Sequence, residues 1–202
     1  MVVPSTEPQT PRLIGLLPDA LSDDQRRLYD SITGGQRASG TRRFPITDEQ
    51  GRLVGPFDAM LRAPRIGDAL QSLGAALRFG GGLPDRAREM VILAVANRED
   101  SAFERFAHEA VGRGVGLRDS ELEALRHGDP LSGDDHIEEV VLRTARILLA
   151  DRDLDDDDYT VAVAVLGEDG LFELTTIVGY YSTLALQLRV FRVGLPDEQS
   201  IR

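Results

Sequence analysis

Apolar residues recur at helical spacing along nearly the whole chain, and this periodicity limits the possible folds more than any other feature. Ile66, Leu70 and Leu73 follow one another at intervals of three or four positions, which places them on one helix face. Alternation of apolar and polar residues occurs only weakly, at residues 160–165, where a preceding aspartate and a following glycine favour helix. The sequence therefore predicts an all-α fold, a bundle of about eight helices.

Glycine and proline mark the ends of the predicted helices. The first helix begins at a capping-box pair, Ser22 and Gln25, and ends at two successive glycines. An irregular connection rich in glycine, proline and charge follows, with a short hairpin expected at residues 48–51. We therefore predict an N-terminal extension, residues 1–55, followed by a single compact helical unit, residues 56–202.

Charge and residue content exclude several classes of function. The net charge of −11 gives a surface that repels phosphate backbones and anionic lipids, so neither nucleic acid nor a membrane is an expected partner. The chain has no cysteine, which excludes disulfides, thiolate metal sites and cysteine nucleophiles. Because there are only three histidines, a histidine-rich metal site is not expected, and we expect no metal. His127 and His136 lie in a polar connection and are expected to be exposed loop residues.

The N-terminus lacks the basic and apolar regions of a secretory signal, so we expect a cytoplasmic protein. The longest apolar segment, residues 171–190, contains Glu173, Gln187 and Arg189. Such a segment is better explained as a buried core helix than as a membrane span.

Glycine-rich and acidic stretches resemble known binding loops only superficially. Neither "GGGLP" nor "GRGVG" has the surrounding residues of a phosphate or dinucleotide loop, so both are interpreted as helix ends. An EF-hand loop starting at Asp151 would need glycine and glutamate where the chain has Asp156 and Ala162. The acidic run is therefore interpreted as a solvated turn and a helix N-terminus.

One stretch, "SAFERFAHEA" at residues 101–110, carries most of the functional signal. Ser101 and Glu104 have capping-box spacing, and His108 would then be a half-buried residue one turn later. Spacing alone favours this structural interpretation. Glu104 and His108 also lie on one helix face, where a carboxylate can orient an imidazole for acid–base chemistry. Glu89, in an apolar run of the preceding helix, is a second acid that could exchange protons with His108 if it is partly buried.

Several segments resemble the carboxymuconolactone decarboxylase family, which includes the AhpD-like alkylhydroperoxidases. They are "GPFDAML", "LPDRAREMVILAVA", "SAFERFAHE" and "GLRDSELEALRHG", while residues 170–196 resemble the tail of longer members. The resemblance implies an AhpD-like helical bundle that forms a homo-oligomer, commonly a trimer or a hexamer.

The resemblance also implies which residues form the site. In the peroxidase branch, a glutamate precedes two cysteines and a histidine, and these positions correspond to Glu89, Ser101, Glu104 and His108. Because both thiols are missing, dithiol peroxidase chemistry is disfavoured. The remaining acid–base residues are similar to those of the decarboxylase side of the family.

We therefore expect a cofactor-free lyase that decarboxylates a small carboxylated lactone or keto acid. His108 would protonate the carbanion, Glu104 would orient His108, and Glu89 would hold or relay the proton. The helix N-terminus at Ser101 would bind the substrate carboxylate.

Four aromatic and apolar residues are candidates for the pocket wall: Phe57, Met60, Tyr180 and Tyr181. Each could equally be a core residue, and for Met60 the core is favoured. Two alternatives stay open at this point: an isomerase, hydratase or hydrolase that uses the same site, and a non-catalytic oligomeric binding protein.

Overall fold

The computed structural model describes residues 10–35, 45–131 and 135–195, and within these ranges the chain is all-α, as predicted. The described residues contain eight α-helices and one short 3-10 helix, and their only β-type contact is an isolated bridge. The elements are η1 (Pro18–Ala20), α1 (Asp23–Gly34), α3 (Pro56–Met60), α4 (Pro64–Phe79), α5 (Asp85–Arg98), α6 (Ala102–Gly114), α7 (Asp119–His127), α8 (His136–Asp151) and α9 (Asp156–Phe191).

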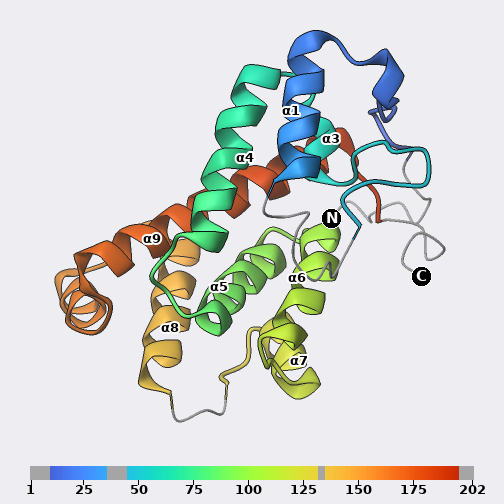
Figure 1. Cartoon of the computed structure of the whole chain (residues 1–202). Helices are drawn as coiled ribbons and strands as arrows, with labels where there is room; N and C mark the ends of the chain where they lie inside the picture. Colours follow the sequence, from blue (N-terminus) through green and yellow to red (C-terminus); the bar gives the residue numbers. More distant parts are fainter. Residues whose placement is uncertain (1–9, 36–44, 132–134, 196–202) are drawn as a thin grey trace.

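Helix α5 is the centre of the fold and packs against α6, α7, α8 and α9 (Figure 1). Its residues 87–96 are all buried, so the helix is enclosed on every face. The sequence explains this position, because the run "MVILAVA" is apolar all round and no face of it favours water. An acid placed in this helix, such as Glu89, therefore lies inside the protein.

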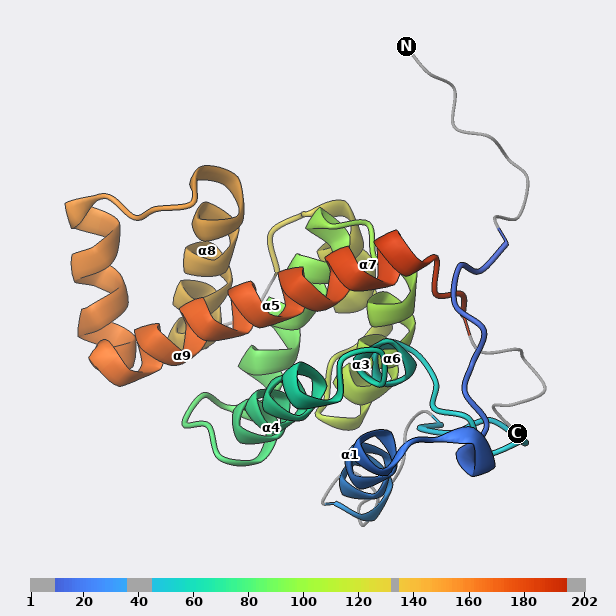
Figure 2. The same ribbon diagram turned by 90° about the horizontal axis from the view of Figure 1, so that it is seen from above.

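Helix α9 extends across the molecule, with α8 near one end and α6 and α7 near the other (Figure 2). It is interrupted at Gly167, whose φ of 73° and ψ of 168° are not helical. Glycine adopts a positive φ at little cost, so the long helix changes direction there. Beyond this kink, α9 buries the Tyr180 and Tyr181 side chains against the bundle.

The N-terminal region confirms two local predictions. Ser22 and Gln25 form the expected capping box at the start of α1. A tight turn follows at residues 48–51, where the Gly51 N–H donates to the Asp48 carbonyl over 3.0 Å. Leu28 of α1 belongs to the same hydrophobic core as α5. The boundary at residue 55 stays a prediction.

His127 and His136 are exposed as predicted, but neither lies in a loop, because His127 ends α7 and His136 begins α8. Among the described helices, none combines the length and the apolar content needed to cross a membrane.

Candidate active site

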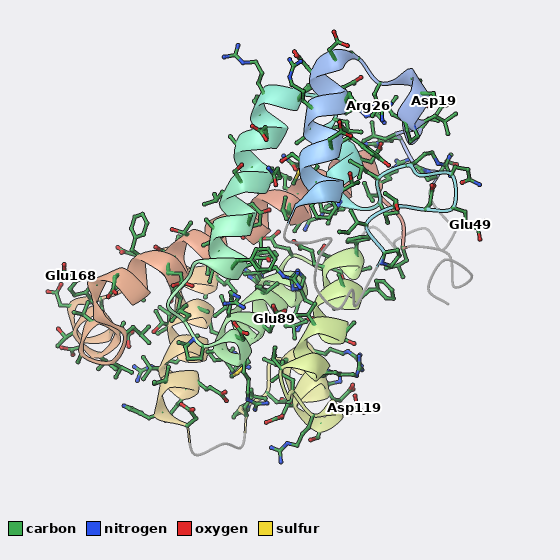
Figure 3. The ribbon with its side chains drawn as sticks, in the orientation of Figure 1. Asp19, Arg26, Glu49, Glu89, Asp119 and Glu168 are labelled. Atoms are coloured by element: carbon green, nitrogen blue, oxygen red, sulfur yellow. The ribbon has the colours of Figure 1, made fainter. Side chains whose placement is uncertain are left out.

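Three buried ionisable residues from two neighbouring helices form the centre of the site. Glu89 lies on α5, and Glu104 and His108 lie on α6. Their exposed fractions are 2% for Glu89, 2% for Glu104 and 7% for His108. Figure 3 shows Glu89 near the middle of the molecule, where α4, α5 and α6 approach one another. Buried ionisable side chains need hydrogen-bond or ionic partners, or they change their protonation state.

The His108 ring is held by Glu89. Its Nδ1 atom lies 2.8 Å from Oε2 of Glu89, within hydrogen-bond distance. The orienting role expected for Glu104 is therefore filled by Glu89, on the adjacent helix. Because Nδ1 is engaged, Nε2 is the ring nitrogen left to meet a ligand.

Aromatic rings of α9 pack against the histidine. The Tyr181 ring meets the His108 ring edge-on, with centroids 5.0 Å apart, and Tyr180 packs edge-on against Tyr181 at the same distance. Burial, followed by the negative charge of Glu89, raises the pKa of Tyr181 well above its ordinary value. Tyr181 is therefore a neutral phenol that fixes the imidazole plane.

Glu104 is a buried carboxyl group that forms no ion pair with any residue in the described part of the chain. Burial raises its pKa to about 8; the Ser101 hydroxyl offsets part of this increase, and the Glu99 charge adds to it. Although Ser101 is near enough to have this influence, neither oxygen of Glu104 forms a hydrogen bond of normal geometry with a described residue. Glu104 is thus protonated at neutral pH and able to donate a proton.

The predicted capping box at the start of α6 is wrong. Ser101 is the N-cap residue, but its side chain makes no capping hydrogen bond, and its Oγ is buried without a partner. Glu104, which should have completed the box, is turned toward the interior instead. The physical reason is packing, because the face of α6 that carries Glu104 and His108 is covered by neighbouring helices.

A small cavity of ≈ 50 Å³ lies beside this cluster. Among its lining residues are Phe57, Glu104, His108, Tyr180 and Tyr181. A larger hollow of ≈ 320 Å³ lies elsewhere. Charged residues that line it, such as Arg86 and Glu121, are paired with each other over 2.7 Å. The smaller cavity is the one lined by both His108 and Glu104.

Two residues predicted to contact substrate lie outside the lining of this cavity. Met60 is a core residue, although it shares α3 with Phe57. Ser101 instead borders a separate surface hollow near the end of α9. Glu89 stands behind His108 and reaches the cavity only through the imidazole.

The structure adds Arg78, which the sequence did not single out. It lies in the last turn of α4 and lines the cavity together with Glu104 and His108. No local pattern distinguishes this arginine from the others in the chain, because its significance depends on the approach of α6 and α9. In the described ranges, no group of three or more His, Asp or Glu residues is arranged to hold a metal ion.

Residues 64–146 match the carboxymuconolactone decarboxylase family. The segment contains Arg78, Glu89, Glu104 and His108, so most of the site lies within the carboxymuconolactone decarboxylase match. A comparison with curated proteins gives no match.

Solved structures show the same fold. The chain is similar to an alkylhydroperoxidase AhpD core, an uncharacterized peroxidase-related protein from Ralstonia eutropha JMP134, with 16% identity, a TM-score of 0.73 and 93% of each chain covered. An uncharacterized peroxidase-related protein from Silicibacter sp. TM1040 is similar over 100% of both chains, with 15% identity and a TM-score of 0.70. A protein of unknown function from Agrobacterium tumefaciens has 19% identity and a TM-score of 0.61, covering 69% of this chain and 97% of that one.

Together with the family match, these similarities confirm the expected AhpD-like helical bundle. The chain carries no cysteine, so the dithiol chemistry of peroxidases is unavailable to it.

Proposed function

We propose that this protein is a cofactor-independent acid–base enzyme, a lyase that decarboxylates a small carboxylated lactone or keto acid. The observation that carries the proposal is that two buried proton carriers, His108 and Glu104, line one cavity. The match of residues 64–146 to the carboxymuconolactone decarboxylase family supports an enzyme of this kind.

The proposed reaction needs a proton donor but no external oxidant or reductant. Cleavage of the bond between the carboxylate and its carbon releases CO₂ and leaves the electron pair on that carbon, as an enolate conjugated with the neighbouring carbonyl. A proton then adds to the carbon, so one carboxylate and one proton become one C–H bond and CO₂. Protonated His108 supplies this proton from Nε2, the nitrogen not engaged by Glu89.

The other residues position and support this transfer. Glu89 accepts a hydrogen bond from Nδ1 and stabilises the protonated ring, which gives it a positioning role. Neutral Glu104 donates a hydrogen bond to the developing enolate oxygen, or resupplies the proton to His108. Phe57 and Tyr180 form walls that keep water from the carbanion.

The same two proton carriers favour one alternative, an isomerase that moves a proton between two carbons of a similar acid. A substrate that gives a rearranged product without CO₂ would support this alternative. Measurement of CO₂ release and of product structure in the same sample therefore distinguishes the two reactions.

We further propose that the protein forms a homo-oligomer, a trimer or a hexamer. Apolar side chains exposed on α9 support this proposal, because Phe172 is 75% exposed and Leu186 is 55% exposed. Small acids are the expected partners, while a cytoplasmic location and the absence of nucleic-acid binding stay predictions from the sequence.

The proposal is tested by mixing the full chain with a panel of β-keto acids and carboxylated lactones and recording CO₂ release. We expect catalysed release from at least one member, and its loss in His108→Gln of unchanged circular dichroism. Release that His108→Gln leaves unchanged would exclude His108 as the proton donor. Release from no member would refute the decarboxylase assignment for these substrate classes.

A further inference from the structure

Arg78 places a positive charge on the wall of the cavity that contains His108. It belongs to the last turn of α4, and its half-buried side chain lines the same cavity as Glu104. Its charge also influences Tyr181 on α9. Burial is the main reason why the pKa of this phenol is raised, and the positive charge of Arg78 offsets part of that increase. The guanidinium is therefore close to the groups that would surround a ligand.

This guanidinium has no acidic partner among the described residues. Its guanidinium carbon lies 5.6 Å from the centroid of the neighbouring Phe79 ring. By contrast, Arg86 and Arg88 pair with the carboxylates of Glu121 and Asp85, and the half-buried Arg146 donates to the Asp129 carbonyl. Because the chain has 34 acidic and 23 basic residues, an unpaired arginine in a cavity is not explained by a shortage of acids.

The carboxyl group that lines the cavity, Glu104, does not neutralise Arg78 at neutral pH. Glu104 is uncharged there, since burial raises its pKa to about 8. Its two oxygens make no hydrogen bond with a described residue, so the cavity combines an unpaired cation with an unpartnered buried carboxyl group. An anionic group on a ligand would neutralise Arg78, and an acceptor oxygen on the same ligand would accept a hydrogen bond from the Glu104 carboxyl group.

We propose that Arg78 is a specificity-determining residue that binds a carboxylate of the substrate, an inference that rests on the proposed function. A guanidinium binds a carboxylate through two parallel N–H···O bonds, which fixes both the position and the orientation of the acid. The aromatic walls then confine the rest of the molecule beside His108. Substrate anchoring thus belongs to α4, whereas the sequence had placed it at Ser101.

A purely structural explanation also exists, because a basic residue in the last turn of a helix interacts favourably with the helix dipole. This role would affect stability without distinguishing acids from neutral ligands. The discriminating property is therefore the preference of the site for a carboxylate over an uncharged group of the same shape.

The test is calorimetric titration of the full chain with 4-oxopentanoate, a stable γ-keto acid, and with its amide. Wild-type protein should bind the acid more tightly than the amide, and Arg78→Gln should weaken acid binding by about 10- to 100-fold, since one charged interaction is lost. Amide binding should change little, and Arg78→Lys should recover part of the preference. Arg65→Gln is the matched control, because Arg65 lies exposed on the same helix, outside the cavity.

Equal weakening of acid and amide in Arg78→Gln, or unchanged acid binding, would overturn the inference. A wild-type protein that does not bind the acid, or does not prefer it, would overturn it as well. Because binding is measured without turnover, an Arg78-dependent carboxylate preference without CO₂ release from any candidate would refute the proposed reaction but not the anchor. Catalysed CO₂ release together with unchanged acid binding in Arg78→Gln would support the proposed reaction and refute the role of Arg78 as the anchor.

Discussion

His108 Nδ1 lies 2.8 Å from Glu89 Oε2, and the two residues are 19 positions apart on different helices. The contact joins the central helix α5 to α6 and fixes which ring nitrogen meets the cavity. Both partners are buried, so removing either one would leave the other without a partner inside the protein. This pair is the structural basis of the acid–base account.

Glu89→Gln should retain the fold but lower the rate of CO₂ release about 100-fold, because the amide does not stabilise a protonated imidazole. The matched control is Glu123→Gln. Glu123 also contacts a histidine, His127, over 2.9 Å, but that pair is exposed on α7. The control should release CO₂ at the wild-type rate, and equal losses in the two variants would contradict a specific role for Glu89.

Stability should fall as the pH rises from about 5 to 8, because of Glu104. Its pKa is 4.5 in the ordinary case and about 8 in the folded protein, so the folded state binds a proton that the unfolded state has lost. In this window each pH unit lowers the free energy of unfolding by at most about 1.4 kcal/mol. The effect ends above pH 8, where Glu104 ionises in the folded state as well.

Urea denaturation at several pH values measures this effect. Glu104→Gln has no group to titrate, so the part of the pH dependence that comes from Glu104 should disappear and the variant should gain relative stability toward pH 8. A wild-type profile that is flat or rises over this window, with the same profile in Glu104→Gln, would show that Glu104 is ionised when folded.

Ser101→Ala should cost little stability, within about 0.5 kcal/mol, because its hydroxyl forms no cap. Ser22→Ala is the natural comparison, since Ser22 does accept a hydrogen bond from Gln25 in a complete capping box. Loss of that cap should cost about 1 kcal/mol in thermal or chemical denaturation. A larger cost for Ser101→Ala than for Ser22→Ala would show that the Ser101 hydroxyl is bonded in solution.

Gly55→Ala should be strongly destabilising and should disturb the cavity wall. Gly55 has a φ of 67°, and an added Cβ would lie 2.2 Å from Cζ of Phe103. Gly128 has a similar φ of 75°, but nothing lies within 4 Å of an added Cβ. Gly128→Ala should therefore cost only the backbone strain, about 1–2 kcal/mol, and Gly55→Ala distinctly more. Similar melting temperatures for the two variants would contradict the close packing at Phe103.

Helical periodicity was sufficient to predict the all-α fold, because helix formation depends on residues close together in the sequence. The apolar run of α5 and the glycine at position 167 are features of this local kind. The sequence identified Glu89 as an acid that could meet His108, but not as the residue that orients it. Spacing on one helix favoured Glu104, but the rotation of α6 turns Glu104 into the cavity and brings Glu89 to the imidazole. That rotation depends on how α5 and α6 pack, which residue spacing does not specify.

Arg78 and Met60 show the same limit. Arg78 gains significance only because α6 and α9 close around the end of α4. Met60 and Phe57 share the short helix α3, yet only Phe57 lines the cavity while Met60 packs in the core. The identity of a pocket residue on such a helix depends on its tertiary neighbours.

The most direct test of the central claim is chemical rescue of His108→Ala by free imidazole, followed through the rate of CO₂ release. His108→Ala should lower the wild-type rate at least about 100-fold, and added imidazole should restore part of it, because the missing proton carrier is returned to its cavity. No CO₂ release by the wild type, or release by His108→Ala at the wild-type rate, would contradict the account.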